Sequence, residues 1–329
     1  MFVRDAWYVG ALSDELAAPL GRMLLGERVV LFRDGAGRAA ALADRCAHRA
    51  APLSAGVVEG DALRCPYHGY RFGADGVCVG IPGQEQVPAA ARVRAWPVVE
   101  RDGFVWLWMG DPAAAAPGLI PDFSSNAKPG WAGVSMHMAA AAGYELLVEN
   151  LLDLSHVAFV HGGTIGSDDT AARLTVERGE DFVRSIRSSH DIPTPPHNIA
   201  QGFAPRCDQT KVMHFTPPSR VTLEITTTER PERSGAPSRS MHLLLHNAMT
   251  PETATSCHYF WASTRDFQVD DTTVSEFFRT VTRTAFEEDL AILALQQENL
   301  EAEPAAAMVS TGNDAAAVAA RRMIAQMRG

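Results

Sequence analysis

Two patterns of apolar and polar positions divide the chain. Up to about residue 112, short apolar or aromatic runs alternate with Gly, Pro and Asp-Gly turns, as in segments 27–35 and 101–108. Runs of this length, broken by turn residues, are typical of short β-strands joined by tight turns. We therefore predict a small all-β domain over residues 1–112.

A different pattern follows residues 111–121, a stretch rich in alanine, glycine and proline without an amphipathic period, which we take as the domain boundary. Beyond it, Tyr144 to about Val160 has the period of a helix, and Thr272 to about Glu301 that of a long amphipathic helix. Several β-like segments run between them from Phe182 to Trp261, and β-branched and aromatic residues indicate antiparallel strands at Val221–Thr228, Met241–His246 and Ser256–Ala262. We predict an α+β domain over residues 113–329, with a helical tail near Ala315.

Composition excludes several classes of protein. The 329 residues are 46% hydrophobic and 21% charged, which is ordinary for a globular protein. The net charge is −10 and the only lysines are Lys128 and Lys211, so no basic stripe is available to follow a nucleic-acid backbone. The N-terminus lacks the features of a signal peptide, and no apolar run is long enough to span a membrane. We predict a cytoplasmic protein that binds neither nucleic acid nor membrane.

The cysteines point to metal binding. Five cysteines are an odd number in a long chain without an export signal, which disfavours a disulfide framework. Two of them stand in the motifs Cys46-Ala-His48 and Cys65-Pro-Tyr-His68. The others have no ligand-like spacing, and we expect them to be small buried residues; these are Cys78, Cys207 and Cys257.

Two thiolates and two imidazoles are the ligands of a Rieske [2Fe–2S] centre, in which two histidines bind one iron and two cysteines the other. A structural zinc site would use the same four residues. Zinc sites usually keep like ligands together, whereas each loop here pairs one cysteine with one histidine. We therefore predict a Rieske cluster on Cys46, His48, Cys65 and His68.

A second group of candidate ligands follows in residues 149–161. Asn150, Asp153 and His156 are spaced to lie along one side of the predicted helix, and His161 precedes the helix-ending pair Gly162-Gly163. Two converging histidines supply part of the facial triad of non-haem Fe(II) oxygenases, which also needs a carboxylate.

Asp289 is the candidate carboxylate. Its helical neighbours at three and four residues are apolar, so it faces the core, whereas Glu287 neighbours Arg283 on a more polar side. A buried acid needs a partner, which iron would provide. The alternatives are a core histidine with ordinary hydrogen bonds and a buried aspartate that caps a helix or forms an ion pair. An electron relay in the same chain requires an acceptor, and this favours the iron triad of His156, His161 and Asp289.

Together these residues resemble the Rieske non-haem iron oxygenases, specifically the oxygenase components related to vanillate and dicamba O-demethylases. The resemblance covers nearly the whole chain. Besides the two Cys-His loops it rests on residues 6–10 (AWYVG), 150–161 (NLLDLSHVAFVH), 215–218 (FTPP), 250–252 (TPE) and 288–291 (EDLA).

The resemblance implies an N-terminal Rieske domain followed by a catalytic domain with an antiparallel sheet and the helix-grip fold. It also implies the cluster and iron ligands named above, a homotrimer, and a role for Asp153 in connecting a Rieske histidine of one subunit to an iron ligand of the next. With Asp153 we group Asn150 as a catalytic residue.

The expected function is that of a terminal oxygenase, which uses O2 to hydroxylate or O-demethylate a small aromatic substrate such as a methoxylated aromatic acid. The chain has no Gly-x-Gly-x-x-Gly motif for a flavin or nicotinamide, so a separate reductase or ferredoxin must supply electrons. The alternatives are a ring-hydroxylating dioxygenase, which would share every ligand, a Rieske electron carrier, and a zinc-stabilised binding module.

Substrate contacts are predicted from one strand. His242, Leu244 and His246 alternate onto one face of it, and Asn247 and Trp261 lie nearby in the same hairpin. If that face lines the active site, His246, Asn247 and Trp261 would contact the substrate; otherwise these histidines lie on the solvent face of the sheet.

Overall fold

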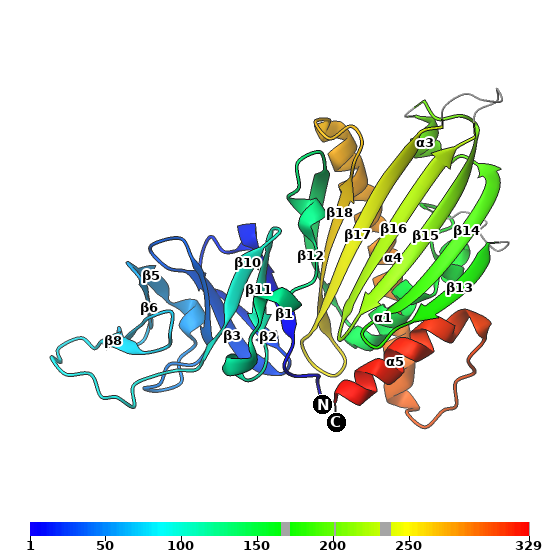
Figure 1. The fold of residues 1–329 in the computed structure, drawn as a ribbon. Helices are drawn as coiled ribbons and strands as arrows, with labels where there is room; N and C mark the ends of the chain where they lie inside the picture. Colours follow the sequence, from blue (N-terminus) through cyan, green and yellow to red (C-terminus); the bar gives the residue numbers. More distant parts are fainter. Residues whose placement is uncertain (166–171, 201, 231–237, 329) are drawn as a thin grey trace. The chain divides into compact units, whose positions relative to one another are not determined.

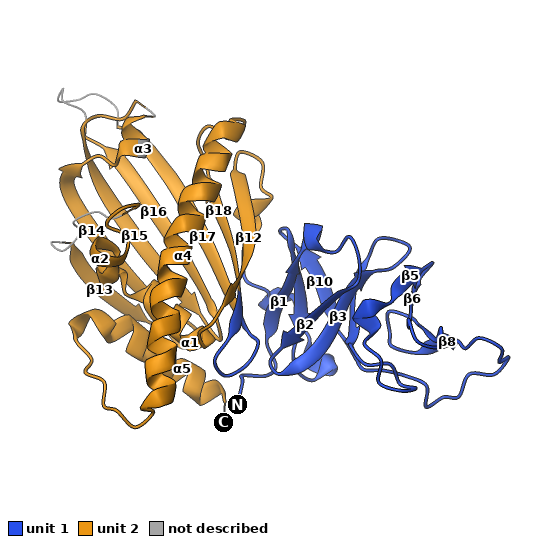
Figure 2. Cartoon of the chain, turned by 180° about the vertical axis from the view of Figure 1, so that it is seen from behind, with its two compact units in different colours: residues 1–122, 250–258 blue, residues 123–249, 259–329 orange. Residues whose placement is uncertain are grey.

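The computed structural model describes residues 1–165, 172–200, 202–230 and 238–328. The chain forms two compact units: unit 1 contains Met1–Asp122 and Thr250–His258, and unit 2 contains Phe123–Met249 and Tyr259–Gly329 (Figure 2). The predicted domains 1–112 and 113–329 stay a prediction, but the packing of unit 1 continues to residue 122. Trp7 Nε1 donates to the carbonyl of Ala116 at 2.9 Å, and Arg101 Nη2 donates to that of Ile120 at 2.7 Å.

Unit 1 is all-β, as predicted, and consists of three small antiparallel sheets with strand orders β1-β11-β10, β2-β3-β4-β9 and β5-β6-β7-β8 (Figure 1). The strands are β1 (Trp7–Leu12), β2 (Leu20–Leu24), β3 (Glu27–Arg33), β4 (Ala39–Ala43), β5 (Val57–Glu59), β6 (Ala62–Arg64), β7 (Arg71–Phe72), β8 (Cys78–Gly80), β9 (Ala95–Trp96), β10 (Val98–Arg101) and β11 (Phe104–Trp108).

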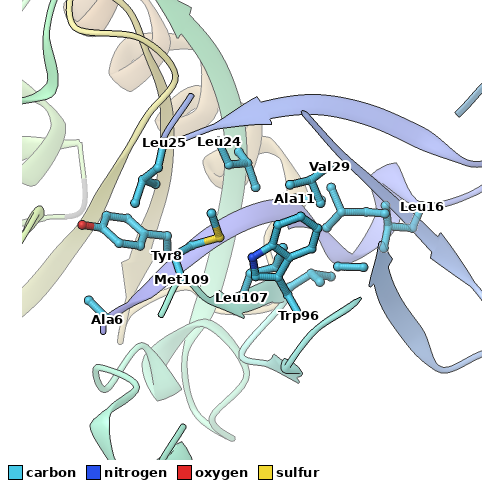
Figure 3. Close-up of a cluster of buried hydrophobic side chains, with 13 residues drawn as sticks. Ala6, Tyr8, Ala11, Leu16, Leu24, Leu25, Val29, Trp96, Leu107 and Met109 are labelled. Carbon is cyan, nitrogen blue, oxygen red and sulfur yellow. The ribbon is translucent and has the colours of Figure 1, made fainter. Parts of the chain in front are cut away.

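The backbone conformation of the turns and the packing of apolar side chains explain this arrangement. Asp102 and Gly103, between β10 and β11, both have positive φ (58° and 85°), which a two-residue hairpin turn of type I′ requires. Behind these strands, thirteen buried side chains pack into one cluster, in which Tyr8, Leu107 and Met109 lie close together (Figure 3). A second cluster of buried residues contains Cys46 and Cys65, so the cysteine ends of both Cys-His loops are anchored in apolar packing.

The Thr250–His258 segment belongs to unit 1 through hydrogen bonds to β1 and the β2–β3 hairpin. Thr250 Oγ1 donates to the carbonyl of Val9 at 2.7 Å, and the Leu25 N–H donates to the carbonyl of Pro251 at 2.7 Å. The Thr-Pro-Glu motif is therefore part of unit 1, although it lies in the second half of the sequence.

Within its described residues, unit 2 is built on an antiparallel seven-stranded sheet of order β12-β18-β17-β16-β15-β14-β13. Its strands are β12 (Ala132–Ala140), β13 (Arg173–Arg178), β14 (Val183–Pro193), β15 (Arg206–Thr216), β16 (Arg220–Glu229), β17 (Ser240–Pro251) and β18 (Cys257–Arg265). Its α-helices are α1 (Tyr144–Leu152), α2 (Val157–Val160), α3 (Pro196–Ile199), α4 (Thr272–Ala302) and α5 (Ala315–Met327). The predicted α+β class, the long helix and the helical tail are confirmed.

Helices α1, α2 and α4 lie over one face of this sheet (Figures 1 and 2), which we call the helix-covered face. On β18, the rings of Tyr259 and Trp261 pack against Phe286 of α4, with ring centroids 5.0 and 5.6 Å apart. Tyr259 Oη donates to Asn247 Oδ1 at 2.7 Å, so Asn247 lies on the same face. Because successive residues of a strand point to opposite faces, His246 points away from the helices.

The predicted helix from Tyr144 to Val160 is wrong as a single element. Helix α1 ends at Leu152, and Asp153 has an extended backbone (φ −116°, ψ 93°). A short 3-10 helix, Leu154–His156, leads into α2. The cause is local, since Asp153 Oδ1 accepts the N–H of Ser155 at 2.9 Å and caps a new helix instead of continuing the old one.

The strands predicted in unit 2 are present and longer than expected, whereas β12 and β13 were not predicted. Among the described residues, no helix is both long enough and apolar enough to cross a membrane.

Candidate active site

The two Cys-His loops have the same backbone geometry. In each loop the N–H four residues after the cysteine donates to the cysteine carbonyl: Ala50 to Cys46 at 3.0 Å, and Gly69 to Cys65 at 3.2 Å. Ala50 and Gly69 both have positive φ, 56° and 71°. The loops therefore turn in the same way, although the histidine stands two residues after the cysteine in one loop and three residues after it in the other.

The donor set fits a Rieske cluster. Cys46 and Cys65 are buried, whereas His48 and His68 are exposed with ring centroids 4.6 Å apart. Burial and the neighbouring Cys65 thiol raise the pKa of Cys46, while the backbone N–H of His48 opposes this rise. Loss of solvation and the nearby His68 lower the pKa of His48, which favours the neutral imidazole that binds metal.

A second cluster of possible ligands lies in unit 2. His156, His161 and Asp289 each offer one ligand atom, and these atoms lie within 4.8 Å of one another. Asp289 Oδ1 is 3.3 Å from His156 Nε2 and 3.2 Å from His161 Nε2. His156 ends the 3-10 helix, His161 follows α2, and Asp289 faces inward from α4. The structure thus brings together all three residues that were predicted for iron.

The charge of this cluster suits a divalent cation. Burial alone would raise the pKa of Asp289, but hydrogen bonds from His156 and His161 outweigh it and lower the pKa to about 2. The carboxylate is therefore ionised at neutral pH although Asp289 is only 5% exposed. Two imidazoles and one buried carboxylate form the donor set of mononuclear non-haem iron sites.

Neighbouring groups orient all three side chains. Asn150 Nδ2 donates to Asp289 Oδ1 at 3.1 Å. The Nδ1 atoms of the histidines face acceptors on the outer side of the cluster: the carbonyl of Asp153 lies 2.7 Å from His156, and Glu288 Oε2 lies 2.7 Å from His161. Both Nε2 atoms are consequently left to face the position of a metal.

The contacts of Asp153 and Glu288 differ from those expected from the sequence. The resemblance implies that Asp153 contacts an iron ligand, and here its backbone carbonyl, not its side chain, lies 2.7 Å from His156 Nδ1. The Asp153 carboxylate accepts the Ser155 N–H and lies 3.4 Å from Arg187 Nη2. Glu288 was missed as a partner of His161, although its position next to Asp289 on α4 was a signal for it.

The predicted substrate contacts do not share one surface. Asn247 and Trp261 lie on the helix-covered face, whereas His246 lies on the opposite face, 2.6 Å from Ser125 Oγ. Asn247 is fully buried and its amide donates to the carbonyls of Val221 and Leu245. Trp261 is also fully buried, with Nε1 3.3 Å from Met138 Sδ. Their contact with a substrate stays a prediction.

Two cations on the helix-covered face escaped sequence reasoning. Arg187 on β14 and Lys211 on β15 are directly paired in the sheet register, so their side chains share a face, and Arg187 reaches Asp153 on the helix side. Arg187 is 6% exposed and Lys211 is half-buried. Alternation along each strand was the available signal, but the sequence does not say which face the helices cover.

Comparison with known proteins agrees with this geometry. Residues 6–96 match the Rieske [2Fe-2S] domain, and residues 140–329 match the C-terminal domain of the vanillate O-demethylase oxygenase. The chain is 40% identical over 282 residues to the oxygenase component of dicamba O-demethylase from Stenotrophomonas maltophilia, covering 82% of this chain and 80% of that protein. It is 37% identical over 328 residues to the iron-sulfur subunit of the toluene-4-sulfonate monooxygenase system of Comamonas testosteroni, covering 96% and 94%.

Among solved structures, dicamba monooxygenase bound to 3,6-dichlorosalicylic acid superimposes with a TM-score of 0.92 and 34% identity, covering 99% of this chain and 97% of that one. A Rieske domain joined to a catalytic domain of this kind defines the oxygenase component of a multicomponent Rieske system, which is an oxidoreductase. The chain belongs to the vanillate O-demethylase oxygenase family, and its N-terminal domain is a Rieske [2Fe–2S] domain. The predicted family, fold class and enzyme class are confirmed.

Proposed function

We propose that this chain binds Fe(II) through His156, His161 and Asp289, and that it uses O2 to hydroxylate or O-demethylate a small aromatic acid. The observation that carries the proposal is the buried cluster of two imidazoles and one carboxylate in a chain that also has a Rieske domain. An electron carrier would need only the Rieske centre. We assign the [2Fe–2S] cluster to Cys46, His48, Cys65 and His68.

Different residues of the chain would have different roles in this reaction. Iron, when bound, supplies O2 activation with electrons that arrive from the Rieske centre and, before that, from a separate reductase or ferredoxin. Three protein ligands leave further coordination positions open. Asn150 holds Asp289 in place, and the buried rings of Trp261 and Phe286 exclude water from that side. For a methyl ether, hydroxylation of the methyl carbon gives a hemiacetal that collapses to a phenol and formaldehyde.

An aromatic substrate is supported by the helix-covered face. Arg187 on β14 is paired with Lys211 on β15 and lies 3.4 Å from the Asp153 carboxylate. The same row of the sheet continues with Ile225 and Leu243, which are apolar and only half-buried, and these suit an aromatic ring. The solved relative that holds 3,6-dichlorosalicylic acid also binds an aromatic acid.

A homotrimer with electron transfer between subunits is the assembly that we propose. Each centre is flanked by an exposed aromatic side chain: Tyr67, beside His68, is 63% exposed, and Phe159, between His156 and His161, is 82% exposed. Aromatic side chains are enriched at the core of protein–protein interfaces. A face carrying Tyr67 on one protomer and a face carrying Phe159 on its neighbour would bury both.

Oxygen uptake by the reduced protein tests this function. The substrates are a panel of methoxybenzoates and the corresponding unsubstituted acids, with formaldehyde and ring products assayed. Formaldehyde formed in proportion to O2 consumed supports O-demethylation, whereas a dihydrodiol indicates the dioxygenase alternative. A protein that has both metals and consumes no O2 with any aromatic acid would contradict the proposal.

A further inference from the structure

Glu288 is the one acidic neighbour of Asp289 that turns toward the candidate iron site among the described residues of α4. Its Oε2 atom lies 2.7 Å from His161 Nδ1 and accepts the hydroxyl of Thr164 at 2.8 Å. Glu287, the preceding residue, lies on the other side of the helix, 3.6 Å from Arg283. Glu288 therefore connects α4 to the segment that follows α2.

This contact fixes the state of the imidazole. A carboxylate only accepts hydrogen bonds, so the hydrogen between the two groups belongs to Nδ1 of His161. Nε2 lies 3.2 Å from Asp289 Oδ1, and a metal held between these two atoms would take the Nε2 lone pair of the neutral ring that keeps its hydrogen on Nδ1. The other tautomer would place the hydrogen on Nε2 and block metal binding, and it would set the Nδ1 lone pair against a carboxylate oxygen.

The two histidines obtain this orientation by different means. His156 faces the backbone carbonyl of Asp153, a neutral acceptor fixed by the end of α1. His161 instead faces a charged side chain, and hydrogen bonds to a carboxylate are about twice as strong as those between neutral groups. His161 is almost fully buried, with its side chain 2% exposed, so no water can replace this acceptor without rearrangement.

We propose that Glu288 is a positioning residue that selects the metal-binding tautomer of His161 and holds its ring, together with Thr164, against α4. The inference rests on the proposed iron site. Glu288 does not bind the metal itself, because its carboxylate oxygen lies on the Nδ1 side of the ring, away from the position between the two Nε2 atoms.

Metal affinity separates this role from catalysis. Metal-free samples of the full-length protein with an intact Rieske centre are titrated anaerobically with Co(II), and the dissociation constant and the visible Co(II) spectrum are recorded. We expect Glu288→Ala to weaken binding roughly 10-fold to 100-fold, as other carboxylate partners of ligating histidines do. Glu288→Gln keeps a neutral acceptor for Nδ1–H and should recover much of that affinity. Glu287→Ala is the matched control and should bind like the unaltered protein.

Three outcomes decide the matter. If Glu288→Ala binds Co(II) with unaltered affinity and spectrum, the proposal is overturned. If Glu288→Gln loses the metal as completely as Asp289→Ala does, Glu288 is a ligand, which also overturns it. If Asp289→Ala itself binds Co(II) normally, the iron site of the proposed function is at fault, and that failure is recognised independently of the Glu288 variants.

Discussion

The four residues of the Rieske loops divide into two environments. The thiols of Cys46 and Cys65 are held in the apolar core of unit 1, whereas the rings of His48 and His68 reach the surface. In the proposed assignment, the exposed histidines would place one side of the cluster where an electron donor or acceptor can approach. The buried cysteines would hold the other side, so the loss of either cysteine should affect the cluster more than the fold.

Replacement of Cys65 by serine tests this division. A hydroxyl does not replace a thiolate on the sulfur-ligated iron, so Cys65→Ser should abolish the visible Rieske spectrum. The matched variant Cys78→Ser lies in the same apolar cluster without a ligand role and should keep the spectrum. Absorption and electron paramagnetic resonance spectra of the purified proteins give the answer. An unaltered spectrum in Cys65→Ser would eliminate the assignment.

At the scale of elements, the interruption at Asp153 separates what the sequence could and could not predict. The apolar period over Tyr144–Val160 is genuinely helical, and α1 and α2 both form within it. The break depends on one side chain, since the Asp153 carboxylate takes the N–H of Ser155. Patterns of apolar and polar residues give little indication that a side chain will compete with the helix backbone in this way. The candidate ligands His156, His161 and Asp289, which the structure brings together, were nevertheless singled out from residue type, spacing and the presence of a second centre in the chain.

The face of a strand was harder to predict than the strand itself. In β17, Leu243, Leu244 and Leu245 are consecutive, so hydrophobicity does not distinguish its two faces. The histidines on even positions suggested an active-site face, but α1, α2 and α4 cover the other one. Which face a helix covers is decided by contacts far apart in sequence, such as Phe286 with Trp261, and these are not visible in local patterns.

The packing of α5 on α1 should make the free energy of unfolding decrease at alkaline pH. Burial of Tyr144, with a smaller contribution from Glu145, raises its pKa to about 12, while Arg328 Nη2 donates to its hydroxyl at 2.9 Å. In the unfolded chain the pKa is near 10, so between pH 10 and 12 the unfolded state loses its proton first. Folding stability should fall across that range by about 2 kcal/mol.

Urea unfolding between pH 9 and 12 measures this effect. Tyr144→Phe removes the ionisable hydroxyl and should flatten the pH dependence by that amount, whereas Tyr67→Phe, at an exposed tyrosine, should leave it unchanged. If Tyr144→Phe keeps the full slope, other groups are responsible for the alkaline loss of stability.

At the scale of the whole molecule, one chain carries two centres in two separate compact units. The proposed function requires an electron to pass from a Rieske centre to a mononuclear iron. Asp153 stands beside this route, because it contacts the His156 ring through its carbonyl while its side chain remains 21% exposed. In the proposed trimer, this partly exposed carboxylate next to a candidate iron ligand would be available to a histidine such as His68 of a neighbouring subunit, and assembly and catalysis would then be coupled.

Asp153→Asn keeps the shape of the side chain and removes its charge. We expect both metals to remain bound and the cluster to remain reducible, while electron transfer to the mononuclear iron falls steeply. The substitution also leaves the buried Arg187 without its 3.4 Å carboxylate partner, which would destabilise the site for a different reason. The double variant Asp153→Asn, Arg187→Met removes that cost, because no unpaired charge remains. Single-turnover oxidation of the pre-reduced protein, with substrate and O2 present, distinguishes the two causes. If the double variant recovers the rate of the unaltered protein, Asp153 serves only to neutralise Arg187. If both variants stay slow with full metal content, the carboxylate itself links the two centres.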